Sequence, residues 1–232
     1  MEIEKVKVNA IPAVIYGSRS EKAYVYVHGK DGHKEEAEHF AVFAEENGWQ
    51  VISMDLPGHG ERKGEMDHFY PWYIIPEMSQ MWAYMSQRWK QMALYGNSIG
   101  AWCSMLAYQK KKVHHALLVS PILDMVHLIE NMMQWAGISE EELEDKQVIQ
   151  TSFGEELSWK YLSFAREHRI TQWKCPTSIL YGSKDHLTEQ YIVDEFAKRH
   201  SCNVKIMEGG EHWFYTKEQL DYMDEWIKEK IR

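Results

Sequence analysis

Short apolar stretches alternate with longer amphipathic ones along most of the chain, which predicts strands separated by helices. Residues 2–9 and 11–16 alternate in the manner of half-buried strands, and the short break at Ala10 predicts a hairpin. Further β-rich runs occupy residues 23–27, 50–54, 92–95, 116–119, 177–181 and 203–207. Helical patterns occupy residues 35–47, 76–90, 98–109, 188–200 and 216–230. This order predicts a mainly parallel sheet with helices on both of its faces.

The alternation stops once, between residues 122 and 173, where helical patterns occur without a convincing strand. These patterns occupy residues 125–135, 139–150 and 155–169. We interpret this segment as a small helical lid inserted between two strands of the sheet. The expected organisation is one α/β core formed by residues 1–121 and 174–232, with the lid at residues 122–173.

Length and composition limit the classes of protein that this chain can represent. With 232 residues, 44% of them hydrophobic, the chain can bury one core but is too short for two full domains with a linker. The net charge of -9 provides no basic surface for a phosphate backbone, so we expect no nucleic-acid partner. No stretch approaches the roughly 18 apolar residues that a membrane span requires. The first ten residues lack the apolar segment of a signal peptide.

Cysteine and histidine usage points to neither a disulfide framework nor a metal. The three cysteines, Cys103, Cys175 and Cys202, are odd in number and lack CxxC spacing, and a reducing cytoplasm fits them best. The twelve histidines are scattered without a chelating pair such as HExxH. We therefore expect a cytoplasmic protein without metal or cofactor. His59 and His68 fall in one predicted loop that can border the pocket, although solvated histidines are more common at such positions and we expect that here.

The candidate nucleophile is Ser98, at the centre of residues 96–100 (GNSIG). Because the carboxyl ends of parallel strands meet at one edge of a sheet, chemistry-bearing residues are expected just after the strands. This motif stands between an apolar strand and a helical pattern, the setting of a strained strand-to-helix turn that projects its central hydroxyl. The flanking glycines let strand and helix pass closely, and the start of the helix favours developing negative charge.

A serine hydroxyl needs a base within hydrogen-bond reach, and the base needs a third group that orients it. His212 and Asp185 have the required chemistry and follow the last two predicted strands. They are therefore expected at the same sheet edge as Ser98, in the chain order serine, aspartate, histidine. Asp124, which follows the strand at residues 116–119, is the alternative acid.

Acyl transfer also needs two preorganised donors for the oxygen that becomes negatively charged. The first candidate is the backbone N–H of Ile99, which follows the nucleophile at the start of the helix. The second is the backbone N–H of Lys30, which follows His28 and Gly29 in the loop expected to face Ser98. We predict that these two amides form an oxyanion hole.

These motifs resemble, in order and spacing, those of the α/β-hydrolase family over nearly the whole chain. Residues 28–29 resemble its oxyanion loop, residues 55–60 (DLPGHG) its DxxGxG turn and residues 96–100 its nucleophile elbow, while Asp185 and His212 match its remaining triad positions. The resemblance implies an eight-stranded sheet whose second strand is antiparallel, with a lid after strand six. The HGGG sequence of one lipase and esterase group is absent. A serine instead of an aspartate at the nucleophile position argues against haloalkane dehalogenation.

The expected function is hydrolysis of a small-molecule carboxylic ester through an acyl-enzyme on Ser98. Methionine and aromatic residues in the lid and at residues 69–73 favour a small to medium apolar or aromatic acyl group. An acyltransferase, a thioesterase or an amidase would use the same triad. The same fold can also serve as a binding protein for small molecules without hydrolysis. The sequence leaves these alternatives and the oligomeric state open.

Overall fold

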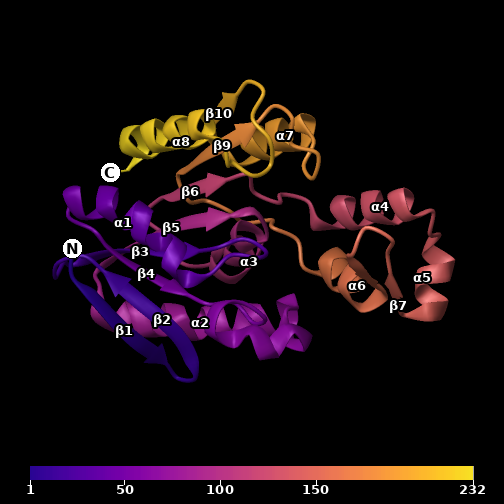
Figure 1. The fold of residues 1–232 in the computed structure, drawn as a ribbon, viewed down its shortest axis with the longest axis horizontal. Helices are drawn as coiled ribbons and strands as arrows, with labels where there is room; N and C mark the ends of the chain where they lie inside the picture. Colours follow the sequence, from indigo (N-terminus) through magenta and orange to yellow (C-terminus); the bar gives the residue numbers. More distant parts are fainter. Residues whose placement is uncertain (232) are drawn as a thin grey trace.

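One eight-stranded sheet forms the centre of the molecule (Figure 1). The computed structural model describes residues 1–231 and orders the strands β1-β2-β4-β3-β5-β6-β9-β10. These strands are β1 (Ile3–Val8), β2 (Ile11–Tyr16), β3 (Lys22–Val27), β4 (Gln50–Met54), β5 (Gln91–Asn97), β6 (Ala116–Val119), β9 (Thr177–Gly182) and β10 (Asn203–Met207). Strand β2 is antiparallel to both of its neighbours, whereas the other pairings are parallel. The predicted fold class is therefore confirmed.

Helices cover both faces of this sheet, and the side chains of β3 show how the faces are divided. Ala23, Val25 and Val27 point into the core beneath α2 (Pro71–Arg88), α3 (Ser98–Tyr108) and α7 (Gln190–His200). Tyr24 and Tyr26 point to the opposite face, which α1 (Ala37–Glu46) and α8 (Lys217–Lys230) cover. Alternate side chains of the strand thus pack into two separate apolar layers, one on each face of the sheet. Among residues 1–231, no helix has both the length and the apolar character needed to cross a membrane.

Helix α2 begins at Pro71, five residues before the start that the sequence pattern predicted at residue 76. Proline suits the first turn of a helix, because its missing N–H would have no intrahelical partner there and its φ is already helical. Pro76 lies inside the helix. The helix packs on the sheet through Met78, Met81 and Met85, which are fully buried at helical spacing.

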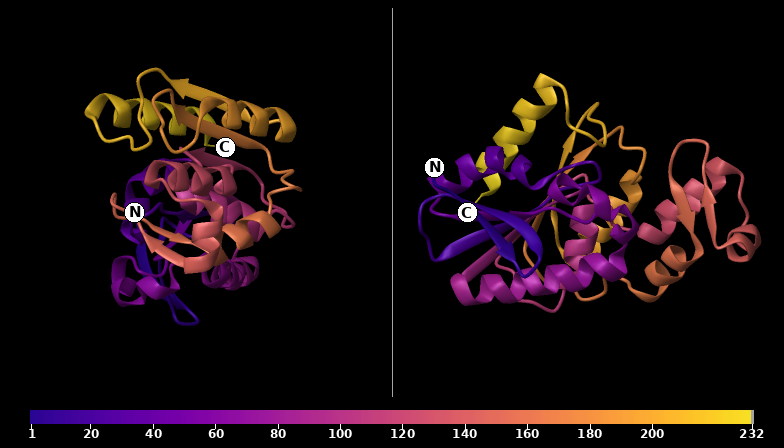
Figure 2. Two further views of the ribbon diagram at one scale, coloured as in Figure 1. Left: turned by 90° about the vertical axis from the view of Figure 1, so that its right-hand side faces the viewer. Right: turned by 60° about the horizontal axis from the view of Figure 1, so that its bottom comes forward.

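Residues 122–173, hereafter the insert, connect β6 to β9 and lie beyond the carboxyl ends of these strands (Figures 1 and 2). The insert contains α4 (Met125–Ala136), α5 (Glu140–Lys146), β7 (Val148–Gln150), β8 (Glu156–Ser158) and α6 (Trp159–Glu167). The division of the chain at residues 122 and 173 into core and lid stays a prediction.

The insert is not purely helical, so the expectation of an insert without strands was wrong. Strands β7 and β8 form a short antiparallel hairpin in place of the predicted helical ends at residues 148–150 and 155–158. Helix α5 ends at Gln147, whose φ of 63° is left-handed and stops the helix. The hairpin turn is closed by Thr151, whose hydroxyl oxygen accepts the N–H of Glu155 at 3.0 Å and donates to its carbonyl at 2.7 Å.

A buried ion pair fixes the turn after β4. The carboxylate of Asp55, which is fully buried, accepts hydrogen bonds from the backbone N–H and the ammonium of Lys34, at 2.8 and 2.7 Å. It also accepts the N–H of Glu61 at 3.0 Å. Gly60 is required here, because a Cβ at this residue would lie 2.1 Å from Asp55 Oδ1. These bonds hold the pKa of Asp55 below its usual range despite its burial, with the Lys34 ammonium as the main stabilising partner.

We predict that Lys34→Met lowers the free energy of unfolding by about 3 to 5 kcal/mol, because it leaves the Asp55 carboxylate buried without a cation. Urea denaturation at neutral pH measures this loss. The double variant Lys34→Met with Asp55→Asn should recover part of it, since the amide carries no charge but keeps an acceptor for the turn. A single variant within 1 kcal/mol of wild type would contradict the prediction.

Candidate active site

Ser98 lies at the junction of β5 and α3 with a φ of 50°, a left-handed conformation that costs free energy for a residue with a side chain. Its two glycine neighbours make the turn possible. A Cβ at Gly96 would lie 2.8 Å from Cα of Ala101, and a Cβ at Gly100 would lie 2.3 Å from the carbonyl oxygen of His28. The helix therefore starts in direct contact with the end of β3, and Ser98 is held at the sheet edge as the sequence predicted.

Ser98, His212 and Asp185 form a continuous chain of hydrogen bonds. Ser98 Oγ lies 2.8 Å from His212 Nε2, and His212 Nδ1 lies 2.7 Å from Asp185 Oδ2. The side chains of His212 and Asp185 are fully buried. A carboxylate can only accept, so His212 carries its proton on Nδ1 and presents Nε2 to the serine hydroxyl. This arrangement can remove the proton from Ser98.

Asp185 is itself held by the backbone that follows it. Its second oxygen, Oδ1, accepts the N–H groups of Leu187 at 2.8 Å and Thr188 at 3.1 Å. The hydroxyl of Thr188 in turn donates to the carbonyl of Pro121, at 3.2 Å, just after β6. The carboxylate is thus oriented toward His212 by a loop that is anchored to the neighbouring strand end.

Asp124, the alternative acid, has a different position in the structure. Its carboxylate caps α4 by accepting the N–H of His127 at 3.1 Å, and it pairs with Arg169 at 3.2 Å. Both partners belong to the insert. The geometry therefore brings Asp185, rather than Asp124, to His212.

The loops that carry the acid and the base touch each other through two glycines, a contact that the sequence analysis missed. A Cβ at Gly182 would lie 2.5 Å from the backbone of Gly210. The N–H of Lys184 donates to the carbonyl of Gly210 at 2.8 Å, which ties the two loops together. The sequence signals for this contact are Gly182, directly after the strand predicted at residues 177–181, and the glycine pair at residues 209–210 before His212. The distance between Asp185 and His212 therefore depends on backbone contact as well as on their own hydrogen bond.

The two predicted oxyanion donors belong to residues near Ser98 in the structure. Gly29 is in direct contact with Ser98, since a Cβ on this glycine would lie 3.2 Å from Cβ of the serine, and Lys30 is the next residue. Ile99 begins the first turn of α3, where the helix dipole favours negative charge. The side chain of Lys30 forms an ion pair with Glu155 of the insert hairpin. The oxyanion role of the two amides stays a prediction.

Two buried histidines hold the loop at residues 28–31 in place, a role that no local sequence pattern predicted. His28 donates from Nδ1 to the carbonyl of Gly29 at 2.7 Å and accepts the N–H of Leu56 on Nε2 at 3.1 Å. His59 donates from Nδ1 to the carbonyl of Pro57 at 2.8 Å and accepts the N–H of Asp31 on Nε2 at 2.9 Å. The expectation that His59 is solvated was wrong, because its imidazole bridges the two loops and is buried. His68 is exposed, as expected.

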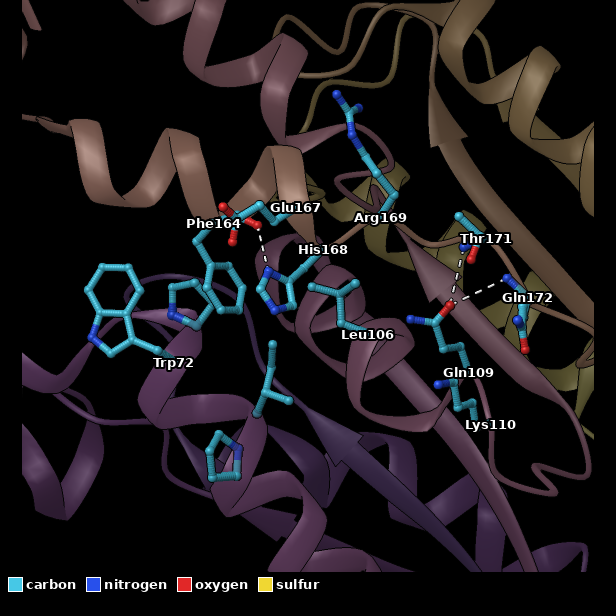
Figure 3. A pocket seen from close by; sticks show the side chains of 13 residues that line it. Trp72, Leu106, Gln109, Lys110, Phe164, Glu167, His168, Arg169, Thr171 and Gln172 are labelled. Atoms are coloured by element: carbon cyan, nitrogen blue, oxygen red, sulfur yellow. Dashed lines mark hydrogen bonds between the residues drawn. The ribbon is translucent and has the colours of Figure 1, made fainter. Parts of the chain in front are cut away.

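Aromatic side chains line the seam between the insert and the core. Tyr161 of α6 lies with its ring centroid 6.1 Å from that of Trp102, which is one turn after Ser98 on α3. Trp72 of α2 contacts both Tyr161 and Phe164, with centroid distances of 6.2 and 6.0 Å. Beyond them, a groove of about 460 Å³ lies between α2, α3 and α6 (Figure 3). Its labelled side chains also include Leu106, Gln109 and His168. The apolar seam therefore begins one turn from the nucleophile.

The chain matches the sequence model of the family described as serine aminopeptidase, S33, over residues 18–166. This is more than half of the chain, so the protein belongs to that family of α/β hydrolases. The match includes Ser98 but ends before Asp185 and His212, which reach the site from the remaining third of the chain. No curated protein matches the sequence.

Several solved structures share the fold over nearly their whole length. A putative hydrolase from Agrobacterium vitis S4 has a TM-score of 0.80 and 17% identity, with 100% of this chain and 99% of that chain covered. Est1E from Butyrivibrio proteoclasticus with bound ferulic acid has a TM-score of 0.77 and 18% identity, with coverage of 97% and 96%. A monoacylglycerol lipase from Paleococcus ferrophilus has a TM-score of 0.66 and 16% identity, with coverage of 99% of both chains. The protein is thus a hydrolase with an esterase-like and lipase-like fold.

Burial lowers the pKa of His28 to about 4, so the imidazole stays neutral in the folded protein. In the unfolded chain it takes up a proton below about pH 6.5. Stability is therefore expected to fall as the pH drops from 6.5 toward 4, by about 3 kcal/mol for the full shift. Denaturant unfolding at several pH values across this range measures the effect. The unfolding free energy should fall less steeply with decreasing pH in His28→Asn than in wild type. Equal slopes would exclude His28 as the source.

Proposed function

We propose that this protein hydrolyses a small-molecule carboxylic ester through an acyl-enzyme on Ser98. The single observation that carries the proposal is the uninterrupted path from Ser98 Oγ through the His212 imidazole to the Asp185 carboxylate. A serine with an oriented base in contact is the arrangement that activates a hydroxyl as a nucleophile.

In the acylation half of the reaction, His212 Nε2 takes the Ser98 proton while Oγ forms a bond to the ester carbonyl carbon. The carbonyl oxygen becomes negative and is stabilised by the backbone N–H groups of Lys30 and Ile99. The carbon–oxygen bond to the leaving group then breaks, and His212 delivers its proton to the departing oxygen. Asp185 holds the imidazole in the productive tautomer and stabilises its cationic form.

In the second half, water takes the place of the departed alcohol. His212 removes a proton from this water as its oxygen attacks the acyl carbon, and the same two amides stabilise the negative oxygen again. The bond to Ser98 Oγ breaks, His212 returns the proton to Oγ, and the carboxylic acid is released. The same residues therefore serve both halves.

The seam of aromatic side chains supports an apolar or aromatic acyl group as the preferred substrate part. Trp102 lies one turn after Ser98 and Tyr161 contacts it, and flat rings accept apolar and aromatic groups with little loss of conformational freedom. Est1E, whose structure was solved with bound ferulic acid, has the same fold. We propose a small to medium acyl group of this kind.

The insert is proposed to act as a lid over the acyl side of the site. Two contacts of its hairpin support this role. Glu155 pairs with Lys30 of the oxyanion loop, and Glu156 accepts a hydrogen bond from the hydroxyl of Tyr70, just before α2. A hairpin held at these two places limits access of water and substrate from that side.

We predict that Ser98→Ala abolishes hydrolysis of p-nitrophenyl esters while the far-ultraviolet circular dichroism stays that of wild type. Labelling by a fluorophosphonate should also be lost, because the probe requires an activated serine. Ser79→Ala, which changes an exposed serine on α2, is the matched control and should keep both properties. Turnover that persists in Ser98→Ala would sink the assignment. A wild-type protein that the probe does not label would instead favour a binding protein without catalysis.

For p-nitrophenyl esters, we predict that kcat/KM rises or holds from acetate to butyrate and benzoate, since the larger acyl groups gain apolar contacts. A steep fall beyond acetate would exclude the proposed acyl site. Matched thioester and anilide substrates test the thioesterase and amidase alternatives. Added alcohol tests the acyltransferase alternative, which requires that the acyl group goes to the alcohol in preference to water.

A further inference from the structure

Two exposed rings border the acid–base pair on its solvent side. Trp213 directly follows His212 and is 56% exposed, and His186 directly follows Asp185 and is also exposed. The ring centroid of Trp213 lies 5.1 Å from that of His212, with the planes nearly perpendicular at 84°, and 5.9 Å from that of His186. The indole therefore packs against the imidazole of the base and leaves much of its own surface open.

The reaction itself determines which part of a substrate reaches this surface. In the proposed acylation, the departing oxygen receives its proton from His212 Nε2, so it must lie within hydrogen-bond distance of this atom. The group attached to that oxygen consequently lies beside His212, on the side away from the oxyanion donors. The imidazole of His212 is fully buried, and Trp213 is the exposed ring that contacts it.

The insert contacts other parts of the site. Its hairpin is tied to Lys30 and Tyr70, and its helix α6 packs on Trp102 through Tyr161. These contacts border the oxyanion loop and the first turns of α3. The acyl group thus faces a surface formed largely by the insert. The leaving group faces a surface formed by the loops after β9 and β10.

We propose that Trp213 and His186 form a leaving-group subsite that takes an alcohol carrying an aryl or sugar ring. An indole face stacks on aryl rings and on the C–H face of a sugar ring, and such contacts contribute to binding beyond simple burial of area. The ring nitrogens of His186 can exchange hydrogen bonds with a hydroxyl on that ring. This subsite rests on the proposed ester hydrolysis, because it is defined by the direction in which the alcohol leaves.

The test compares three acetate esters that share one acyl group, namely methyl acetate, benzyl acetate and methyl 6-O-acetylglucoside. Trp213→Ala should lower the ratio of kcat/KM for a ring ester to kcat/KM for methyl acetate by about five- to tenfold, mainly through KM. Trp213→Phe should keep most of the wild-type ratio, since it retains an aromatic face. Trp135→Ala is the matched control, because Trp135 is similarly exposed at 49% but lies on α4 of the insert. The kcat/KM ratio of this variant should equal that of wild type.

A second measurement uses the acyl-enzyme formed from p-nitrophenyl acetate and is independent of the first chemical step. Added benzyl alcohol should capture the acetyl group less often in Trp213→Ala than in wild type, relative to capture by methanol. The ring ester whose kcat/KM ratio falls most in Trp213→Ala shows whether the subsite binds aryl or sugar alcohols better. Unchanged ratios for both ring esters in Trp213→Ala would overturn the subsite alone. Absence of turnover of any ester by the wild-type protein would overturn the proposed function instead.

Discussion

The close contact between the start of α3 and the end of β3 is the constraint on which the site depends. At Gly100 there is no space for even one additional carbon atom beside the carbonyl of His28. Ser98 and the loop at residues 28–30 are therefore coupled through this backbone contact, and a shift of either would move the other. Strand β5 pairs with β3 on one side and β6 on the other, which gives the strained φ of Ser98 a rigid support.

Buried polar groups, rather than apolar packing alone, position the loops around this contact. His28 and His59 connect the oxyanion loop to the turn after β4, and Asp55 connects that turn to Lys34. On the other side of the nucleophile, Thr188 connects the acid loop to the segment after β6. Because a buried polar group without its partner is costly, each of these bonds favours one arrangement of the loops over all others.

The sequence predicted the strands of the core and the meeting of Ser98, Asp185 and His212 at one sheet edge, because the signals for both are local. The β-rich run at residues 23–27 indicates a strand. The glycines on both sides of Ser98 indicate a tight turn between a strand and a helix. Other features left no such signal. Strands of three residues, such as Val148–Gln150, are too short to show a period, and the helical composition around them dominates the pattern. His59 accepts the N–H of Asp31, which is distant in sequence and is brought near only by the fold.

The path of the insert has a consequence for how such a protein can change over generations. Strands β6 and β9 are parallel neighbours, so the chain leaves the sheet at the carboxyl end of β6 and re-enters it at the amino end of β9, where Thr177 lies beside Ala116. Closing a flexible loop between two fixed points costs only about 0.6 kcal/mol more when its length doubles. Loop-closure entropy therefore opposes a longer or shorter insert only weakly, whereas the buried apolar side chains of residues 122–173 belong to the same core as strand β3. Packing against the core, rather than the connection of the chain, is thus what limits how such an insert can change over generations.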